Sequence, residues 1–174
     1  MRVIAGEFKG RRLHTARGAR TRPTADRVRE ALFSMLGDVS GARVLDLYAG
    51  SGALGIEALS RGAESAVFVE RDSQALAALR RNLDAVGADA VVKRQDALRF
   101  VARPGGPYDL VFCDPPYDDA PRVAAPLAEA LPALLRENAR IVTESDKRNP
   151  LVLPLPAVVE RSYGHTRIAI HQAA

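Results

Sequence analysis

The stretch Asp46-Leu47-Tyr48-Ala49-Gly50-Ser51-Gly52-Ala53-Leu54-Gly55 follows a short apolar run and opens onto a helical pattern. Glycines in such a turn let the backbone pass close to a ligand and adopt torsions that other residues resist. In a doubly wound sheet this crevice, at the carboxyl ends of the strands, is where nucleotides bind. The acid at Asp46, two positions before Tyr48, suits a ligand that carries a cation better than a pyrophosphate.

Alternating strand and helix patterns surround this turn. Apolar runs predict strands and amphipathic periods predict helices along the chain. A βαβ series demands a parallel sheet covered on both faces, so we expect an α/β fold. The expected strands are 43–48, 66–70, 90–94, 109–113 and 139–144, and the expected helices are 53–61, 73–86 and 123–135.

Both ends of the sequence depart from the βαβ series. Residues 2–14 alternate around Lys9-Gly10 and predict a small β-hairpin, and a helix over 25–36, capped by Thr24, follows it. Near the other end, 158–163 and 167–171 flank Gly164-His165 and predict an antiparallel hairpin. We therefore expect a basic hairpin-and-helix extension over 1–38 and a catalytic domain over 39–174.

Composition limits the class of protein. The 174 residues suit one domain, and 47% hydrophobic with 26% charged residues is typical of a soluble globular protein. No apolar run approaches the roughly 18 residues of a membrane helix, and the first residues lack a secretion-signal pattern. We expect a cytoplasmic protein without membrane partners. The single Cys113 and three scattered histidines predict neither a disulfide nor a metal site.

Positive charge is concentrated at the front of the chain. Residues 1–29 hold nine basic and two acidic side chains, an excess of seven, whereas the whole chain nets only +4. Such a field is expected of a phosphate-binding surface, although a solvated basic tail would give the same composition. The predicted RNA contacts are Lys9, Arg11, Arg12, Arg20, Arg22, Thr24 and Arg27.

Acids end three successive strands. After Asp46, Glu70 ends the second strand and Asp96 follows the third. S-adenosylmethionine offers an ammonium group, two ribose hydroxyls and an adenine amine, so acceptors are what its pocket needs. We therefore predict S-adenosylmethionine as the cofactor. Its predicted binding residues are Asp46, Tyr48, Gly50, Ser51, Gly52, Glu70, Arg71, Asp96, Ala97 and Asp114.

The fourth expected strand stops at Asp114-Pro115-Pro116-Tyr117, the predicted catalytic tetrapeptide. Two consecutive prolines stiffen the backbone and remove two amide donors, which makes the turn a rigid acceptor site. An exocyclic amine of a base could donate its hydrogens to Asp114 and to the Pro115 carbonyl, with its lone pair aimed at the sulfonium methyl. Tyr117 could stack on that base.

These motifs resemble class I S-adenosylmethionine-dependent methyltransferases with a Rossmann-like fold. The segment 20–34, Arg-Thr-Arg-Pro-Thr-Ala-Asp-Arg-Val-Arg-Glu-Ala-Leu-Phe-Ser, resembles the signature of the bacterial 16S ribosomal RNA guanine-N2 methyltransferase family often called RsmD. The resemblance implies a seven-stranded, mostly parallel sheet. It also implies that Asp46, Gly50 and Gly52 line the methionine end of the cofactor, that Glu70 holds its ribose and that Asp96 contacts its adenine. By the same resemblance, residues 114–117 present the guanine, and residues 22–24 border the entrance for the cofactor and the RNA.

The same resemblance implies the partner: 16S ribosomal RNA within the 30S subunit or a late assembly intermediate, bound by a monomer.

Other interpretations of the function stay open. A DNA adenine methyltransferase can also carry Asp-Pro-Pro-Tyr, but no segment here is spare for a DNA-reading domain. A protein-glutamine methyltransferase usually has Asn at the position of Asp114. A nicotinamide-dependent oxidoreductase and a non-catalytic RNA-binding protein are the remaining alternatives.

Overall fold

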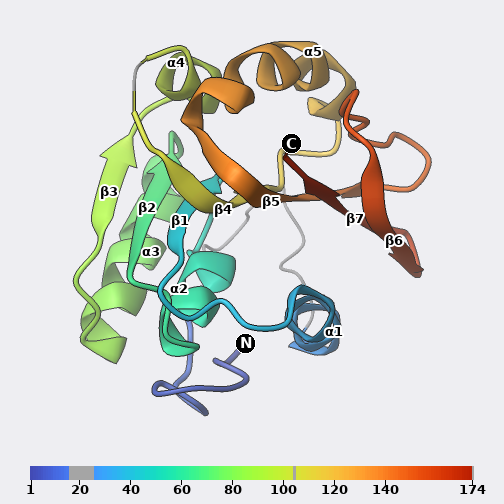
Figure 1. Cartoon of the computed structure of the whole chain (residues 1–174). Coiled ribbons are helices and arrows are strands. Elements are labelled where there is room, and N and C mark those ends of the chain that lie inside the picture. The colour runs from blue at the N-terminus through green and yellow to red at the C-terminus, as the bar shows by residue number, and fades with distance from the viewer. Residues whose placement is uncertain (16–25, 104, 174) are drawn as a thin grey trace.

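A twisted seven-stranded sheet with helices on both faces forms the protein (Figure 1). The computed structural model describes residues 1–15, 26–103 and 105–173. Its strands are β1 (Arg43–Leu47), β2 (Ser65–Glu70), β3 (Val91–Arg94), β4 (Tyr108–Cys113), β5 (Leu135–Asp146), β6 (Ala157–Tyr163) and β7 (Thr166–Gln172). The helices are α1 (Asp26–Leu36), α2 (Ala53–Ser60), α3 (Ser73–Val86), α4 (Ala97–Val101) and α5 (Ala120–Ala130), which a 3₁₀ turn over Leu131–Leu134 continues.

The strand order is β3-β2-β1-β4-β5-β7-β6. The first five of these strands run parallel, and β7 is antiparallel to both β5 and β6. This arrangement confirms the predicted α/β fold and the predicted antiparallel hairpin, whose turn contains Gly164 at φ +63°. The order reverses between β1 and β4, and ligands of open α/β sheets bind in the crevice at such a point.

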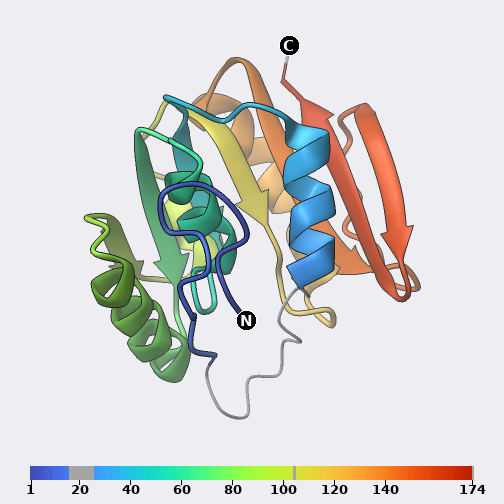
Figure 2. The same cartoon turned by 90° about the horizontal axis from the view of Figure 1, so that it is seen from below.

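Two hydrophobic cores fill the two sides of the sheet. On one side α1, α2 and α3 pack on residues such as Val44, Phe68 and Phe112. On the other side α4 and α5 pack on Leu45, Val111 and others (Figures 1 and 2). Because both faces are covered, the parallel strands are apolar on both sides.

The structure refines several predicted boundaries. The chain reverses over the first thirteen residues as expected, but its ladder consists of the single bridge between Arg2 and Arg12 instead of two regular strands. The helix expected over 123–135 starts three residues earlier, at Ala120, and passes into a 3₁₀ turn at Leu131. The short helix α4 was not predicted, because a helix of five residues has no measurable period. The predicted cap at Thr24 lies outside the described residues.

The front of the chain packs on the same core as the sheet. Val3 and Leu13 are buried with Leu32 and Phe33 of α1 in the core beneath α2. Arg29 of α1 is fully buried, pairs with Asp26 at 3.1 Å and donates to the Arg2 carbonyl. The described parts of the extension, residues 1–15 and 26–38, therefore pack against the rest of the molecule.

Candidate active site

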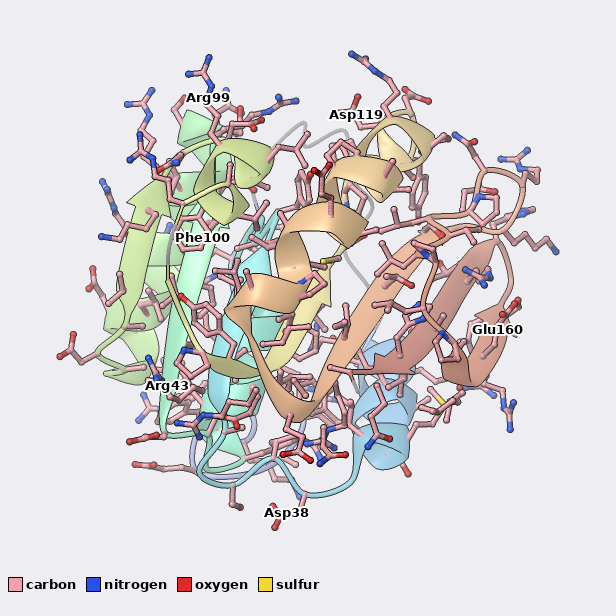
Figure 3. The ribbon with its side chains drawn as sticks, turned by 45° about the horizontal axis from the view of Figure 1, so that its top comes forward. Asp38, Arg43, Arg99, Phe100, Asp119 and Glu160 are labelled. Carbon is pink, nitrogen blue, oxygen red and sulfur yellow. The ribbon has the colours of Figure 1, made fainter. Side chains whose placement is uncertain are left out.

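The predicted site residues gather at one end of the sheet. Figure 3 shows Asp119, which follows β4, at one end of the molecule, with Arg99 of α4 beside that end. Arg43, which starts β1, lies at the opposite end. The carboxyl ends of the parallel strands therefore share one end with the start of α4 and α5, which is where an α/β sheet binds its ligand.

The turn between β1 and α2 needs its glycines. Gly52 has φ +81°, and a Cβ there would lie 2.3 Å from Leu79 Cδ1. Gly55 lies against the sheet so closely that a Cβ would lie 2.3 Å from Phe68 Cε1. The turn also holds Tyr48 at φ +60°, a conformation that costs a side-chain-bearing residue free energy. Its backbone is therefore fixed by close packing on α3 and β2.

Asp46 is buried where β1 meets this turn. Its Oδ2 accepts the backbone N–H of Gly55 at 3.0 Å, so the carboxyl holds the first turn of α2. Burial raises the pKa of Asp46 to about 8; the bond from Gly55 opposes that rise, and the nearby charge of Glu70 adds to it. A cation brought to this carboxyl would favour its ionised form.

Glu70 holds the glycine turn from the next strand. One oxygen accepts the N–H of Gly50 at 2.8 Å, and the other accepts those of Arg71 and Asp72 at 2.7 and 2.8 Å. The carboxylate thus joins the turn after β1 to the turn after β2. A carboxylate has about four acceptor positions, so one remains for a ligand hydroxyl.

Asp96 and Arg71 form the outer side of the site. Asp96 caps α4 by accepting the N–H of Arg99 at 3.2 Å, and the following Ala97 is buried. The guanidinium of Arg71 lies 3.4 Å from Asp96 and 3.6 Å from Asp119. This arginine therefore links the strand tip of β2 to the loop that follows the tetrapeptide.

The tetrapeptide ends β4 next to the glycine turn, because β1 and β4 are neighbours with Leu47 opposite Cys113. Burial is the main cause of a pKa of Asp114 well above its ordinary value, and the charges of Glu144 and Asp46 add to it. Within the described chain, no group donates a hydrogen bond or forms an ion pair with the Asp114 carboxyl. The carboxyl is therefore available to an incoming donor.

Tyr117 is held by the C-terminal part of the sheet. Its backbone carbonyl accepts a hydrogen bond from the side-chain amide of Asn149 at 2.9 Å, and Thr166 of β7 lies near its hydroxyl. Burial is the main cause of the raised pKa of its hydroxyl. Tyr48 is also half-buried, and its hydroxyl has no partner in the described ranges. Two partly buried tyrosines therefore lie just after the neighbouring strands β1 and β4.

The predicted RNA contacts divide into two groups. Lys9, Arg11, Arg12 and Arg27 are exposed, and Arg11 reaches the Ala85 carbonyl of α3 at 3.4 Å. Arg20, Arg22 and Thr24 lie outside the described residues. Two hollows, of about 480 and 400 Å³, open on this surface, and Arg2 and Asp26 line both; Arg12 and His14 line the first, and Lys9 and Arg27 the second.

Several residues that position the site were missed at the sequence level. Glu57 accepts the N–H groups of Ile4 and Ala5 at 2.8 and 3.0 Å, and Asn82 bonds to the backbone of His14 and Ser51. Their partners lie far away in the sequence, so no local pattern identifies them. Glu144 is buried beside Asp114 at the end of β5. The sequence feature that could have identified Glu144 is an acidic residue near the end of an apolar run, as at Asp46 and Glu70.

Two kinds of feature are absent from the described part of the chain. No cluster of three or more potential metal ligands occurs in residues 1–15, 26–103 and 105–173. Within the same ranges, every helix is too short or too polar to cross a membrane.

The family model described as "Conserved hypothetical protein 95" matches residues 1–172. A Bacillus subtilis protein named "Putative rRNA methyltransferase YlbH" is 40% identical over 99% of this chain and 98% of its own. The Haemophilus influenzae "Ribosomal RNA small subunit methyltransferase D" is 38% identical over 88% of this chain and 83% of its own. The chain belongs to this family, the RsmD-type methyltransferases.

A solved structure agrees with the family. The structure titled "Putative methyltransferase yhhF from Escherichia coli" superposes with a TM-score of 0.86 at 36% identity, covering 99% of this chain and 97% of that one. The RsmD-type fold therefore extends over the whole sheet, including the C-terminal hairpin and the first residues.

Proposed function

We propose that the protein transfers the methyl group of S-adenosylmethionine to the exocyclic N2 amine of a guanine in 16S ribosomal RNA of the small ribosomal subunit. One observation carries the proposal: the stiff, donor-poor Asp114-Pro115-Pro116-Tyr117 corner ends the strand beside the glycine turn after β1. An amine held at that corner lies next to a ligand held at that turn. The names of the RsmD-type relatives support ribosomal RNA as the substrate.

The residues at the strand tips suit S-adenosylmethionine, which supplies a methyl group on a sulfonium centre. A ligand can approach the backbone of the turn 50–52 closely, because the space beside Gly50 is open. A Cβ built on Gly50 would meet only the Tyr48 carbonyl oxygen, at 4.0 Å. Asp46 with Tyr48 and Ser51 would hold the methionine end, Glu70 the ribose through one hydroxyl, and Arg71, Asp96 and Ala97 the adenine. Asp114 would face the methyl group.

The tetrapeptide would act by orienting the amine. The Asp114 carboxyl and the Pro115 carbonyl accept its two hydrogens, and the nitrogen lone pair then points at the methyl carbon. Pro116 keeps the corner rigid, and Tyr117 stacks on the base. Because the raised pKa of Asp114 strengthens it as a proton acceptor, the carboxyl also suits the proton that the amine releases.

The extension over 1–38 would face the RNA, with the catalytic domain over 39–174 behind it. Lys9, Arg11, Arg12 and Arg27 would contact phosphates, and we assign Arg20, Arg22 and Thr24 to the same surface from the sequence. We infer that recognition depends on preformed RNA shape in the 30S subunit or a late assembly intermediate. We propose that a monomer acts on it in the cytoplasm.

One experiment tests this function. The protein is incubated with methyl-labelled S-adenosylmethionine and, separately, with 30S particles, naked 16S RNA and duplex DNA, and the modified base is then mapped. We expect N2-methylguanine at one position, in the 30S sample. Label on adenine in DNA, or no label with any substrate, would contradict the proposal.

The cofactor has its own control. S-adenosylmethionine at 100 times its Kd should stabilise the fold by about 2.7 kcal/mol and raise the Tm, because it binds only the folded state. A nicotinamide dinucleotide should leave the Tm unchanged. The reverse result would favour the oxidoreductase alternative.

A further inference from the structure

Glu144 lies beside Asp114 although it belongs to a different strand. The register between β4 and β5 pairs Cys113 with Thr143, so the next residues on each strand, Asp114 and Glu144, are neighbours. Adjacent strands are about 4.8 Å apart. The Glu144 side chain is only 3% exposed. It shares the sheet face of Val142, which packs in the same core as Phe112, and that is also the face of Asp46.

The charge of Glu144 affects two residues of the tetrapeptide. Glu144 is, after burial, the largest cause of the raised pKa of Asp114, and its charge also acts on the Tyr117 hydroxyl. Like charges brought together away from water oppose ionisation and weaken the fold. Acids in such an arrangement gather at functional sites, where the shifted pKa of a carboxyl serves the chemistry.

The chemistry of guanine offers such a partner. Beside its N2 amine, guanine carries an N1–H donor, whereas the ring nitrogen beside the N6 amine of adenine is an acceptor. Asp114 and the Pro115 carbonyl account for the two N2 hydrogens. The N1–H group still requires an acceptor, since a buried donor without one costs free energy.

We propose that Glu144 is that acceptor, a second carboxylate of the base site that receives the guanine N1–H while Asp114 holds the N2 amine. The assignment rests on the proposed function. Glu144 then selects guanine, because a base with an acceptor at N1 would face the carboxylate with its own lone pair. A hydrogen bond from N1–H to a carboxylate also moves electron density toward N2, which strengthens a weak nucleophile.

The transfer step balances with these two acids. The N2 lone pair bonds to the methyl carbon while the carbon–sulfur bond breaks, and its electron pair stays on sulfur to give S-adenosylhomocysteine. The N2 proton passes to the Asp114 carboxylate and then to solvent. Glu144 keeps its hydrogen bond to N1–H throughout.

A base analogue tests the assignment directly. 2-Aminopurine has the amine of guanine but an acceptor at N1 and no O6. Particles are reconstituted with guanine or 2-aminopurine at the mapped nucleotide, and the initial rates of methyl transfer are compared. Wild-type protein should prefer guanine. Glu144→Gln should lose about 10- to 100-fold of its guanine rate and most of its preference, because the glutamine amide can donate to N1 of 2-aminopurine.

Two further variants complete the test. Glu144→Asp keeps an acceptor, so it should retain the preference for guanine at a reduced rate. Glu160→Gln makes the same chemical change on β6, at the far edge of the sheet in Figure 3, and should behave as wild type. A melting-temperature increase with S-adenosylmethionine verifies that each variant is folded.

The outcomes separate the two proposals. A wild-type preference that persists unchanged in Glu144→Gln, at whatever rate, overturns the role of Glu144 and leaves the proposed function intact. Wild-type protein that labels no guanine in the reconstituted particles overturns the proposed function, and the role of Glu144 with it.

Discussion

Asn82 donates a 2.9 Å hydrogen bond from its side-chain amide to the backbone carbonyl of Ser51. The same side chain accepts the N–H of His14 at 2.7 Å and donates to its carbonyl at 2.9 Å. A fully buried residue of α3 thus ties the front of the chain to the glycine turn. The proposed RNA-facing extension and the proposed cofactor turn are therefore mechanically connected.

Replacing Asn82 should affect both regions. Asn82→Ala removes three hydrogen bonds to partly buried backbone groups of His14 and Ser51, so we expect a loss of about 1–3 kcal/mol in the free energy of unfolding. We also expect weaker binding of S-adenosylmethionine. Urea denaturation and calorimetry measure the two effects. Arg80→Ala, on the exposed side of the same helix, is the control, and equal results for both variants would refute the connection.

Asp114→Ala should separate binding from chemistry. The variant loses the acceptor that orients the amine, and we expect methyl transfer to fall by about 100-fold or more. Binding of the cofactor, measured by calorimetry, should change little, because the glycine turn and Glu70 are untouched. Turnover at the wild-type rate would remove Asp114 from the catalytic set.

The raised pKa of Asp46 predicts a pH dependence of stability. The folded state keeps this proton to about pH 8, whereas the unfolded chain releases it near pH 4, so the unfolded state binds fewer protons between these values. The free energy of unfolding of the wild type should therefore fall as pH rises through this window, by up to about 1.4 kcal/mol per pH unit from this group. Asp46→Asn should show a flatter profile.

Asp146 supplies a control of opposite sign. Hydrogen bonds from Arg148 are the main cause that lowers the pKa of Asp146 to about 2. Its contribution is present above about pH 4 and is lost as pH falls toward 2. Asp146→Asn should therefore keep the wild-type slope between pH 4 and pH 8. Denaturation in urea across the pH range checks both variants, and an identical slope in Asp46→Asn and wild type would contradict the assignment.

Charge reversal should test the basic surface. Arg11→Glu and Arg12→Glu, singly and together, should weaken binding to 30S particles and flatten its salt dependence, because fewer counterions are released. Arg136→Glu reverses a charge that pairs with Asp109, whose carboxylate also bonds to Arg43 at the opposite end of the sheet, and should have little effect. Unchanged binding in the double variant would make the basic surface only a solvated one.

Sequence patterns predicted those features that depend on local order. Strands buried on both faces are continuous apolar runs, and the acids after them predicted that Asp46, Glu70 and Asp96 lie at the same end of the sheet. Their detailed roles depend on the fold: Glu70 accepts three backbone N–H groups, and Asp96 also caps α4. These bonds form only when turns from different strands meet.

Contacts between distant segments could not be predicted. Glu57 and Asn82 bind backbone groups more than fifty residues away, and each is an ordinary polar residue on a helix in the sequence. Glu144 becomes a neighbour of Asp114 through the register of β4 and β5, which periodicity does not specify. Arg29 is buried because the folded front of the chain covers it, and the helical period alone does not reveal that cover.

The order of the last strands in the sheet constrains how the protein folds during its synthesis. β7 follows β6 in the chain but lies between β5 and β6. During synthesis β6 therefore leaves the ribosome before the only strand with which it pairs. The edge of β5 near Glu144 stays unpaired until β7 is made and pairs with both strands. An incomplete chain that stops before β7 therefore keeps an unpaired edge on β5 beside the proposed base site, and such an edge favours aggregation.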